Sequence, residues 1–138
     1  ARHAPARESV HARAVGHLWA DDVQGALFYL RKAVDGDPAN ARLWLQLGFA
    51  EGKAGLGQQR IKSYRKAIEL DPSLCAARYL LGMNLLMVGN RDEAQAQYKA
   101  LKDLKSPYAE RLKRFLDTLH VDELEDRKVR HPRKDKSA

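Results

Sequence analysis

The sequence repeats itself with a period of 34 residues. Aspartate–proline pairs end at Pro38 and Pro72, and the runs before them, YLRKAVDGDP and SYRKAIELDP, are similar. Three further pairs of identical residues keep the same spacing: Gly48 and Gly82, Gly55 and Gly89, and Tyr64 and Tyr98. A period of this length is typical of repeats in which each unit is one pair of helices that stacks on the next pair. The period therefore predicts an all-α stack of helical hairpins.

The middle repeat shows the two helices of such a hairpin most clearly. Apolar residues recur at helical spacing on both sides of a glycine-bearing turn at residues 53–57. We expect the two backbones to approach closely at Gly48 and Ala67, because these residues are small. The second helix should end at Asp71, since the residue before a proline is disfavoured in the helical conformation. The bulk that fills the seam between the helices is expected from Trp44, Leu47 and Tyr64.

These residues match the pattern of the tetratricopeptide-repeat (TPR) family, which the chain resembles over roughly residues 7 to 107. In the middle repeat the matching residues are Trp44, Leu47, Gly48, Tyr64, Ala67 and Pro72. Arg60 departs from the pattern, because it stands where a small alanine is usual. The first repeat matches at Ala14, Ala26, Leu30, Ala33 and Pro38, and the third at Leu81, Gly82, Ala94 and Tyr98. The resemblance implies a right-handed superhelical stack of three TPR hairpins that acts as a protein-interaction module.

The resemblance also divides the chain into segments. We expect three repeats at residues 7–40, 41–74 and 75–106, a capping helix at residues 107–126, and disordered ends at residues 1–6 and 127–138. The capping helix is indicated by an apolar stripe made of Tyr108, Leu112, Phe115, Leu116 and Leu119. A helix of this kind covers the apolar face that a stack leaves open at its end. Two alternatives stay open: the helix enters the binding groove, or it pairs with another copy of the chain.

The net charge of +7 is concentrated in the two ends of the chain. Residues 21–126 hold sixteen basic and sixteen acidic side chains, whereas residues 127–138 hold six basic side chains and one acidic one. This basic tail is short and has no aromatic residue to stack on bases, which favours a solubilising end over nucleic-acid binding. Binding of nucleic acid or an anionic surface by the tail is kept as the weaker alternative. No apolar run is long enough to span a membrane.

The sequence contains no arrangement of residues that supports catalysis, a cofactor or a metal ion. No two of the five histidines have the helical spacing of a zinc site, and the single cysteine, Cys75, excludes an internal disulfide. We therefore expect a protein that is not an enzyme. One cysteine fits a reducing, cytoplasmic compartment, although a removed leader segment is equally consistent with the sequence.

The resemblance implies a concave groove that is lined by the first helix of each repeat. Its expected lining residues are His11, Val15, Trp19, Arg42, Leu45, Phe49, Lys53, Tyr79, Met83, Leu86 and Met87. TPR domains that clamp the C-terminal carboxylate of chaperones carry lysine, arginine and asparagine where this chain has Leu45, Phe49, Tyr79 and Met83. The apolar lining instead favours a partner peptide or amphipathic helix with apolar anchors. The alternative is a self-associating scaffold whose groove is filled by the final helix or by another subunit.

Overall fold

The computed structural model describes residues 22–119, and this part of the chain is helical and contains no strand. The predicted all-α class is confirmed, as a stack of helices. The elements are α2 (Val23–Gly36), α3 (Ala41–Lys53), α4 (Gly57–Leu70), α5 (Cys75–Met87), α6 (Arg91–Asp103) and a further helix at residues 108–119. The beginning of the first expected repeat, residues 7–21, and the two ends expected to be disordered, residues 1–6 and 127–138, lie outside the described residues.

Side-chain caps fix where three of these helices begin. The Asp22 carboxylate accepts a hydrogen bond from the backbone N–H of Gly25 at 2.9 Å, and the Asn40 side chain accepts two N–H bonds at the start of α3. At α6 the Asn90 side-chain oxygen accepts from the N–H of Glu93, while its amide group donates to the Glu93 carboxylate. Each cap satisfies backbone donors that have no partner inside the helix.

The turns from α3 to α4 and from α5 to α6 each require glycine. Gly55 has a φ of 79° and Gly89 has a φ of 84°, values in the left-handed region that side chains disfavour. In both turns the next residue closes the turn with a 2.8 Å hydrogen bond, from Leu56 to the carbonyl of Glu51 and from Asn90 to that of Leu85. The 34-residue spacing of these glycines thus reflects one turn geometry used twice.

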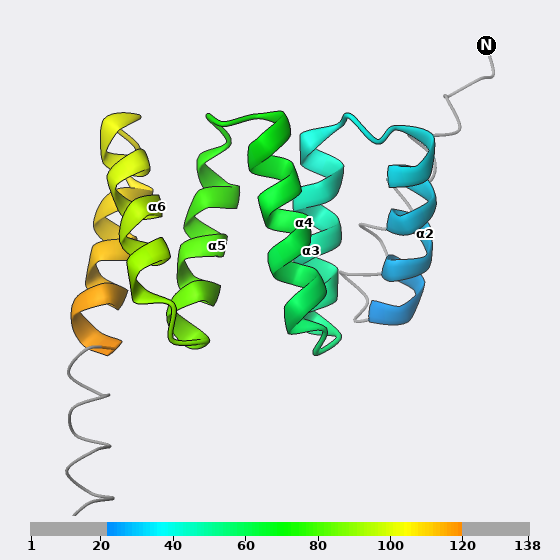
Figure 1. The fold of residues 1–138 in the computed structure, drawn as a ribbon. Coiled ribbons are helices and arrows are strands. Elements are labelled where there is room, and N and C mark those ends of the chain that lie inside the picture. Colours follow the sequence, from blue (N-terminus) through cyan, green and yellow to red (C-terminus); the bar gives the residue numbers. More distant parts are fainter. Residues whose placement is uncertain (1–21, 120–138) are drawn as a thin grey trace, which may run out of the picture.

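The helices stand side by side in a row, and each one packs mainly on its neighbours in chain order (Figure 1). Gly48 is the point of close approach between α3 and α4: a Cβ added there would lie 2.6 Å from a ring carbon of Tyr64. Tyr64 is 1% exposed and belongs to a buried cluster that also contains Leu81 and Leu85. The hairpin of residues 41–72 therefore closes on a tyrosine ring that fits against a glycine.

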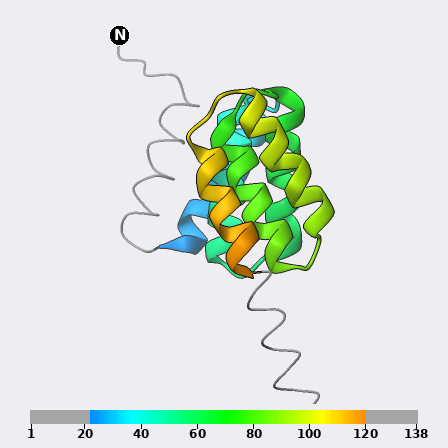
Figure 2. The same cartoon turned by 90° about the vertical axis from the view of Figure 1, so that its left-hand side faces the viewer.

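The helix at residues 108–119 packs at the far end of the row, alongside α5 and α6 (Figure 2). Ala109, Leu112 and Leu116 are buried in the same cluster as Leu81 and Leu85. Gly82 makes room for this helix, since a Cβ at Gly82 would lie 2.7 Å from a methyl carbon of Leu112. Arg91 also donates a 2.8 Å hydrogen bond to the carbonyl of Leu116. The C-terminal half of the described chain is thus held as one packed unit.

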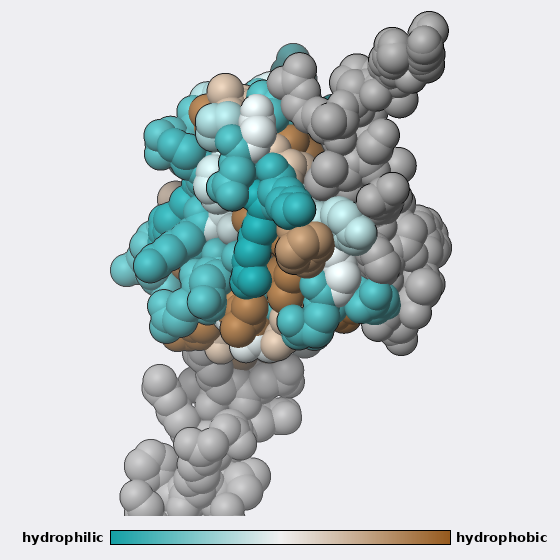
Figure 3. Space-filling view, turned by 90° about the vertical axis from the view of Figure 1, so that its right-hand side faces the viewer, coloured by the Kyte–Doolittle hydropathy of each residue, from teal (hydrophilic) through white to brown (hydrophobic). Residues whose placement is uncertain are grey.

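The opposite end of the row is formed by α2. Figure 3 faces this end and shows an apolar strip that runs between polar side chains. Phe28 of α2 is 53% exposed, and the ammonium group of Lys32 lies 4.6 Å from the centre of its ring. Among residues 22–119 no helix has the length and the apolar character needed to cross a membrane.

Candidate functional site

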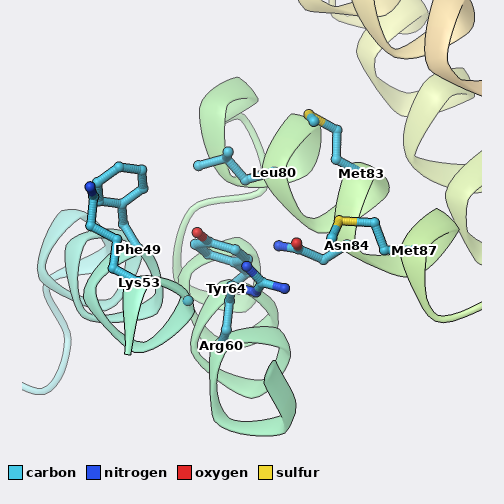
Figure 4. A pocket seen from close by; sticks show the side chains of 9 residues that line it. Phe49, Lys53, Arg60, Tyr64, Leu80, Met83, Asn84 and Met87 are labelled. Atoms are coloured by element: carbon cyan, nitrogen blue, oxygen red, sulfur yellow. The ribbon is translucent and has the colours of Figure 1, made fainter. Parts of the chain in front are cut away.

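A pocket of about 300 Å³ opens between the C-terminal halves of α3 and α5 and the N-terminal half of α4 (Figure 4). Three residues of α3, two of α4 and four of α5 line it: Phe49, Gly52, Lys53, Arg60, Tyr64, Leu80, Met83, Asn84 and Met87. Most of the lining surface is apolar. The pocket therefore lies between the first helices of two successive hairpins, with the second helix of the earlier hairpin as its floor.

The apolar side chains of the pocket come from equivalent positions of the two repeats. Phe49 and Met83 are 34 residues apart, and so are Lys53 and Met87. Phe49 is 44% exposed and Met87 is 66% exposed, so large apolar side chains face solvent at the mouth of the pocket. Lys53 extends beside Phe49, with its ammonium nitrogen 5.7 Å from the ring centre. Exposed apolar side chains gathered on one concave surface are typical of a binding site.

Besides Lys53, three polar groups lie within this apolar lining: Arg60, Tyr64 and Asn84. The Arg60 side chain lies against Gly52, where an added Cβ would be 2.5 Å from its Cδ atom. Its Nε atom is buried and has no hydrogen-bond partner. Asn84 is only 6% exposed, and its side chain makes no hydrogen bond within the described residues. Burial raises the pKa of Tyr64 to about 12, although the nearby charge of Arg60 lowers it in part.

A buried carboxylate, Glu51, lies next to these residues in α3 but does not line the pocket. It is 5% exposed and accepts a 2.5 Å hydrogen bond from the hydroxyl of Ser63 in α4. Burial raises the pKa of Glu51, and the Ser63 hydrogen bond and the charge of Arg31 oppose this shift. Glu51 therefore ties α3 to α4 and leaves the pocket itself without an acidic group.

The structure brings four of the predicted groove residues together in this pocket: Phe49, Lys53, Met83 and Met87. Three others in the described chain lie elsewhere on or near the same face. Arg42 is exposed at the start of α3, Leu45 is half-buried against the core, and Tyr79 stacks on Tyr108 with ring centres 4.8 Å apart. His11, Val15 and Trp19 lie outside the described residues.

Leu86 requires a correction. The sequence pattern assigns it to the groove, but its side chain is 6% exposed and belongs to the buried cluster of α5, α6 and the helix at residues 108–119. Helix α5 is apolar around most of its circumference, so hydrophobic periodicity alone does not separate its groove face from its core face. Leu86 lies in the same buried cluster as Ala94 of α6, so this position belongs to the packed core.

Sequence reasoning did not identify five of the lining residues: Gly52, Arg60, Tyr64, Leu80 and Asn84. One signal was available, because Arg60 stands where the repeat pattern has a small residue. A large residue at that position needs space on the facing helix, and Gly52 provides it. Tyr64 was expected in the seam between the helices, and it contributes to both the seam and the pocket floor. In the described part of the chain no group of three or more His, Cys, Asp or Glu side chains is placed to hold a metal ion.

Comparison with known proteins identifies the repeat unit. Residues 41–74 match the family model described as tetratricopeptide repeat. The chain is 31% identical over 101 residues to the superkiller complex protein 3 of Mus musculus; this match covers 73% of the chain but only 6% of that protein. The chain thus spans a small fraction of the length of this relative.

Solved structures of helical-repeat domains have the same fold. The TPR domain of Arabidopsis OM64 superposes with a TM-score of 0.73 at 19% identity, covering 82% of this chain and 95% of that one. PcrH, solved in complex with the chaperone binding region of PopD, gives a TM-score of 0.74 at 20% identity, covering 84% and 92%. The matching repeat, the 34-residue period and the stacked helical hairpins all agree, and the chain belongs to the tetratricopeptide-repeat family.

Proposed function

We propose that this protein is a non-enzymatic interaction module that binds a partner peptide or amphipathic helix in the concave groove between α3 and α5. The observation that carries the proposal is the pocket at the centre of this groove. Its lining, most of which is apolar, contains Phe49, Met83 and Met87. Methionine side chains are flexible and polarisable, so they adapt to apolar anchors of different shapes.

Three structural relatives support a peptide ligand for this scaffold. PcrH was solved with the chaperone binding region of PopD, and the translocator chaperone SycD of Yersinia enterocolitica with a peptide of YopD. The second TPR of Spaghetti (RPAP3) was solved with an HSP90 peptide. These proteins are 17% to 23% identical to this chain, so their particular partners are not carried over to it. What is carried over is the use of a stacked TPR scaffold to hold an extended segment.

The test places a charge at the proposed anchor site. Phe49→Glu and Met83→Glu each put a carboxylate where an apolar side chain of the partner would be buried, which disfavours association because burying an unpaired charge is costly. Proteins captured by the wild-type chain are identified by mass spectrometry, and binding of the purified candidates is then measured with both variants. We expect both variants to lose binding while they keep the helical circular dichroism of the wild type.

Phe28→Glu is the matched control, since Phe28 is also an exposed phenylalanine on a helix but lies on α2, away from the pocket. This variant should bind as the wild type does. Retention of the same partners by folded Phe49→Glu and Met83→Glu proteins would refute the groove as the binding site.

A second candidate function is self-association into a structural scaffold. It is favoured by two apolar side chains at the C-terminal end of the described stack, Leu104 and Phe115, which are 41% and 39% exposed. Light-scattering mass measured over a concentration series tests this candidate. A mass that stays at the monomer value of 15.6 kDa at high concentration would exclude it, whereas an increase that Phe115→Glu abolishes would support it.

A further inference from the structure

We propose that the pocket selects partners that carry an acidic side chain next to an apolar anchor, and that Arg60 together with Asn84 binds the carboxylate. This inference rests on the proposed function and names the chemistry of the partner. In Figure 4 the Arg60 and Asn84 side chains lie next to each other in the middle of the lining, beside the ring of Tyr64. The apolar residues Leu80, Met83 and Met87 surround them.

The first argument is that both polar groups have unused hydrogen-bonding capacity. Most of the Arg60 side chain is enclosed, and its buried Nε atom has no partner. Asn84 is 6% exposed as a whole residue, and its amide lines the pocket and makes no hydrogen bond within the described residues. Buried polar groups in folded proteins are nearly always paired, so the unpaired Nε atom of Arg60 makes the free protein less stable. A ligand carboxylate that hydrogen-bonds the Arg60 guanidinium and the Asn84 amide uses this free capacity.

The second argument is charge complementarity. Lys53 and Arg60 line the pocket, and no aspartate or glutamate does. Glu51 is next to the lining residues Gly52 and Lys53 in sequence, but its carboxylate already accepts a hydrogen bond from the hydroxyl of Ser63. A guanidinium group binds a carboxylate through two parallel hydrogen bonds, and such bonds are stronger in a site with little water. The pocket therefore fits one negative charge, with apolar side chains on either side of it.

The third argument is that Arg60 and Gly52 together create a specific place for the guanidinium group. Arg60 stands where a small residue is usual in this repeat, and Gly52 leaves the space in which its head group lies. In the next repeat the equivalent residues, 34 positions later, are Leu86 and Ala94, and both are buried in the core. The same seam is thus closed by apolar packing in one repeat and holds a cation beside the groove in the other.

The experiment is a selection from a display library of random twelve-residue peptides with fixed Gly-Ser flanks, so that no peptide presents a free C-terminus. Peptides selected by the wild-type protein should be enriched in Asp or Glu adjacent to Leu, Ile, Phe or Met. The same selection with Arg60→Gln should keep the apolar residues and lose the acidic ones. Arg114→Gln, which changes an exposed arginine outside the pocket, is the matched control and should select the same peptides as the wild type.

Synthetic copies of the most enriched peptide are then used to measure how much its acidic residue contributes to the binding affinity. Replacing its acidic residue by the corresponding amide should weaken binding to the wild type by about tenfold or more, and should have little effect on binding to Arg60→Gln. Asn84→Leu, which keeps the side-chain size, should reduce the difference in affinity between the acidic peptide and its amide counterpart. Amidation of the peptide C-terminus should leave the affinity unchanged, and a large loss on amidation would overturn the inference in favour of recognition of a chain end.

The two proposals can fail separately. Selected peptides that are apolar and show no acidic preference, or a preference that folded Arg60→Gln retains, would refute the role of Arg60 and leave the groove proposal standing. Peptide binding that Phe49→Glu does not affect would refute the groove proposal itself.

Discussion

The close contact between Gly48 and Tyr64 makes Gly48→Ala a sensitive test of the packing in the hairpin. The added Cβ would lie 2.6 Å and 2.7 Å from two ring carbons of Tyr64 and 3.3 Å from the Cβ of Ser63. Carbon atoms in contact are normally separated by about 3.5–4.0 Å, so the ring or the helix must move by about 1 Å. Because Tyr64 is only 1% exposed and packs in a buried cluster, a shift of its ring disturbs the contacts with its core neighbours.

The expected magnitude follows from two opposing effects. Overpacking of a closed core costs about 1–3 kcal/mol, and the severity of this contact favours the upper part of the range. Alanine in place of glycine within a helix returns about 1 kcal/mol. The net loss in the free energy of unfolding is therefore about 2 kcal/mol, which lowers the melting temperature by roughly 8 °C or more in a domain of this size.

Urea and thermal unfolding followed by circular dichroism measure this loss. Gly57→Ala is the matched control, since Gly57 begins α4 and nothing lies within 4 Å of an added Cβ there. That variant should be more stable than the wild type by about 0.4–1 kcal/mol. In the Gly48→Ala background, Tyr64→Leu should cost less than it does alone, because the clash has been removed. If Gly48→Ala were stabilised as much as Gly57→Ala, the account of the hairpin contact would be wrong.

Three further predictions concern a buried acid, a strained turn and a helix cap. Burial raises the pKa of Glu51 above its ordinary value of 4.5, so the stability that its protonated form provides is complete below that value and is lost as the pH rises through the raised pKa. In urea titrations the wild type should therefore lose stability relative to Glu51→Gln as the pH is raised from acid to neutral. Lys105 has a φ of 55°, and Lys105→Gly should raise the free energy of unfolding by about 0.5–1 kcal/mol in thermal melts. Asn40→Ala removes the cap of α3 and should cost about 1 kcal/mol by the same measurement.

The repeat period predicted the helices well because their ends depend on local chemistry. Helix α4 ends at Leu70, just before the Asp71–Pro72 pair that was expected to stop it. Gly55 lies in the expected turn between α3 and α4, and Gly89 adopts the same left-handed conformation one repeat later. Each of these features depends on the residue itself and on neighbours close in sequence, so a single sequence contains the information needed.

The groove was predicted less completely because its lining depends on how helices pack side by side. Leu80 and Leu86 are both leucines of α5, yet Leu80 lines the pocket and Leu86 is buried in the core. Which of the two is exposed depends on how α5 packs against the helices beside it, and that packing is a tertiary feature. Asn84 was overlooked for a related reason, since one polar residue within an apolar helix has no periodicity of its own.

The difference between the two repeats at a single seam explains how this stack acquires a chemically distinct site. At Leu86 and Ala94 the first helix provides the large side chain and the second helix the small one, and the seam is dry. At Gly52 and Arg60 the order is reversed, and the large residue carries a charge. A long charged side chain places its apolar stem against the neighbouring helix and its head group towards open space. Because Arg60 lines the pocket between α3 and α5, reversing the sizes at one seam places a cation in the groove while the helices themselves keep their repeat geometry.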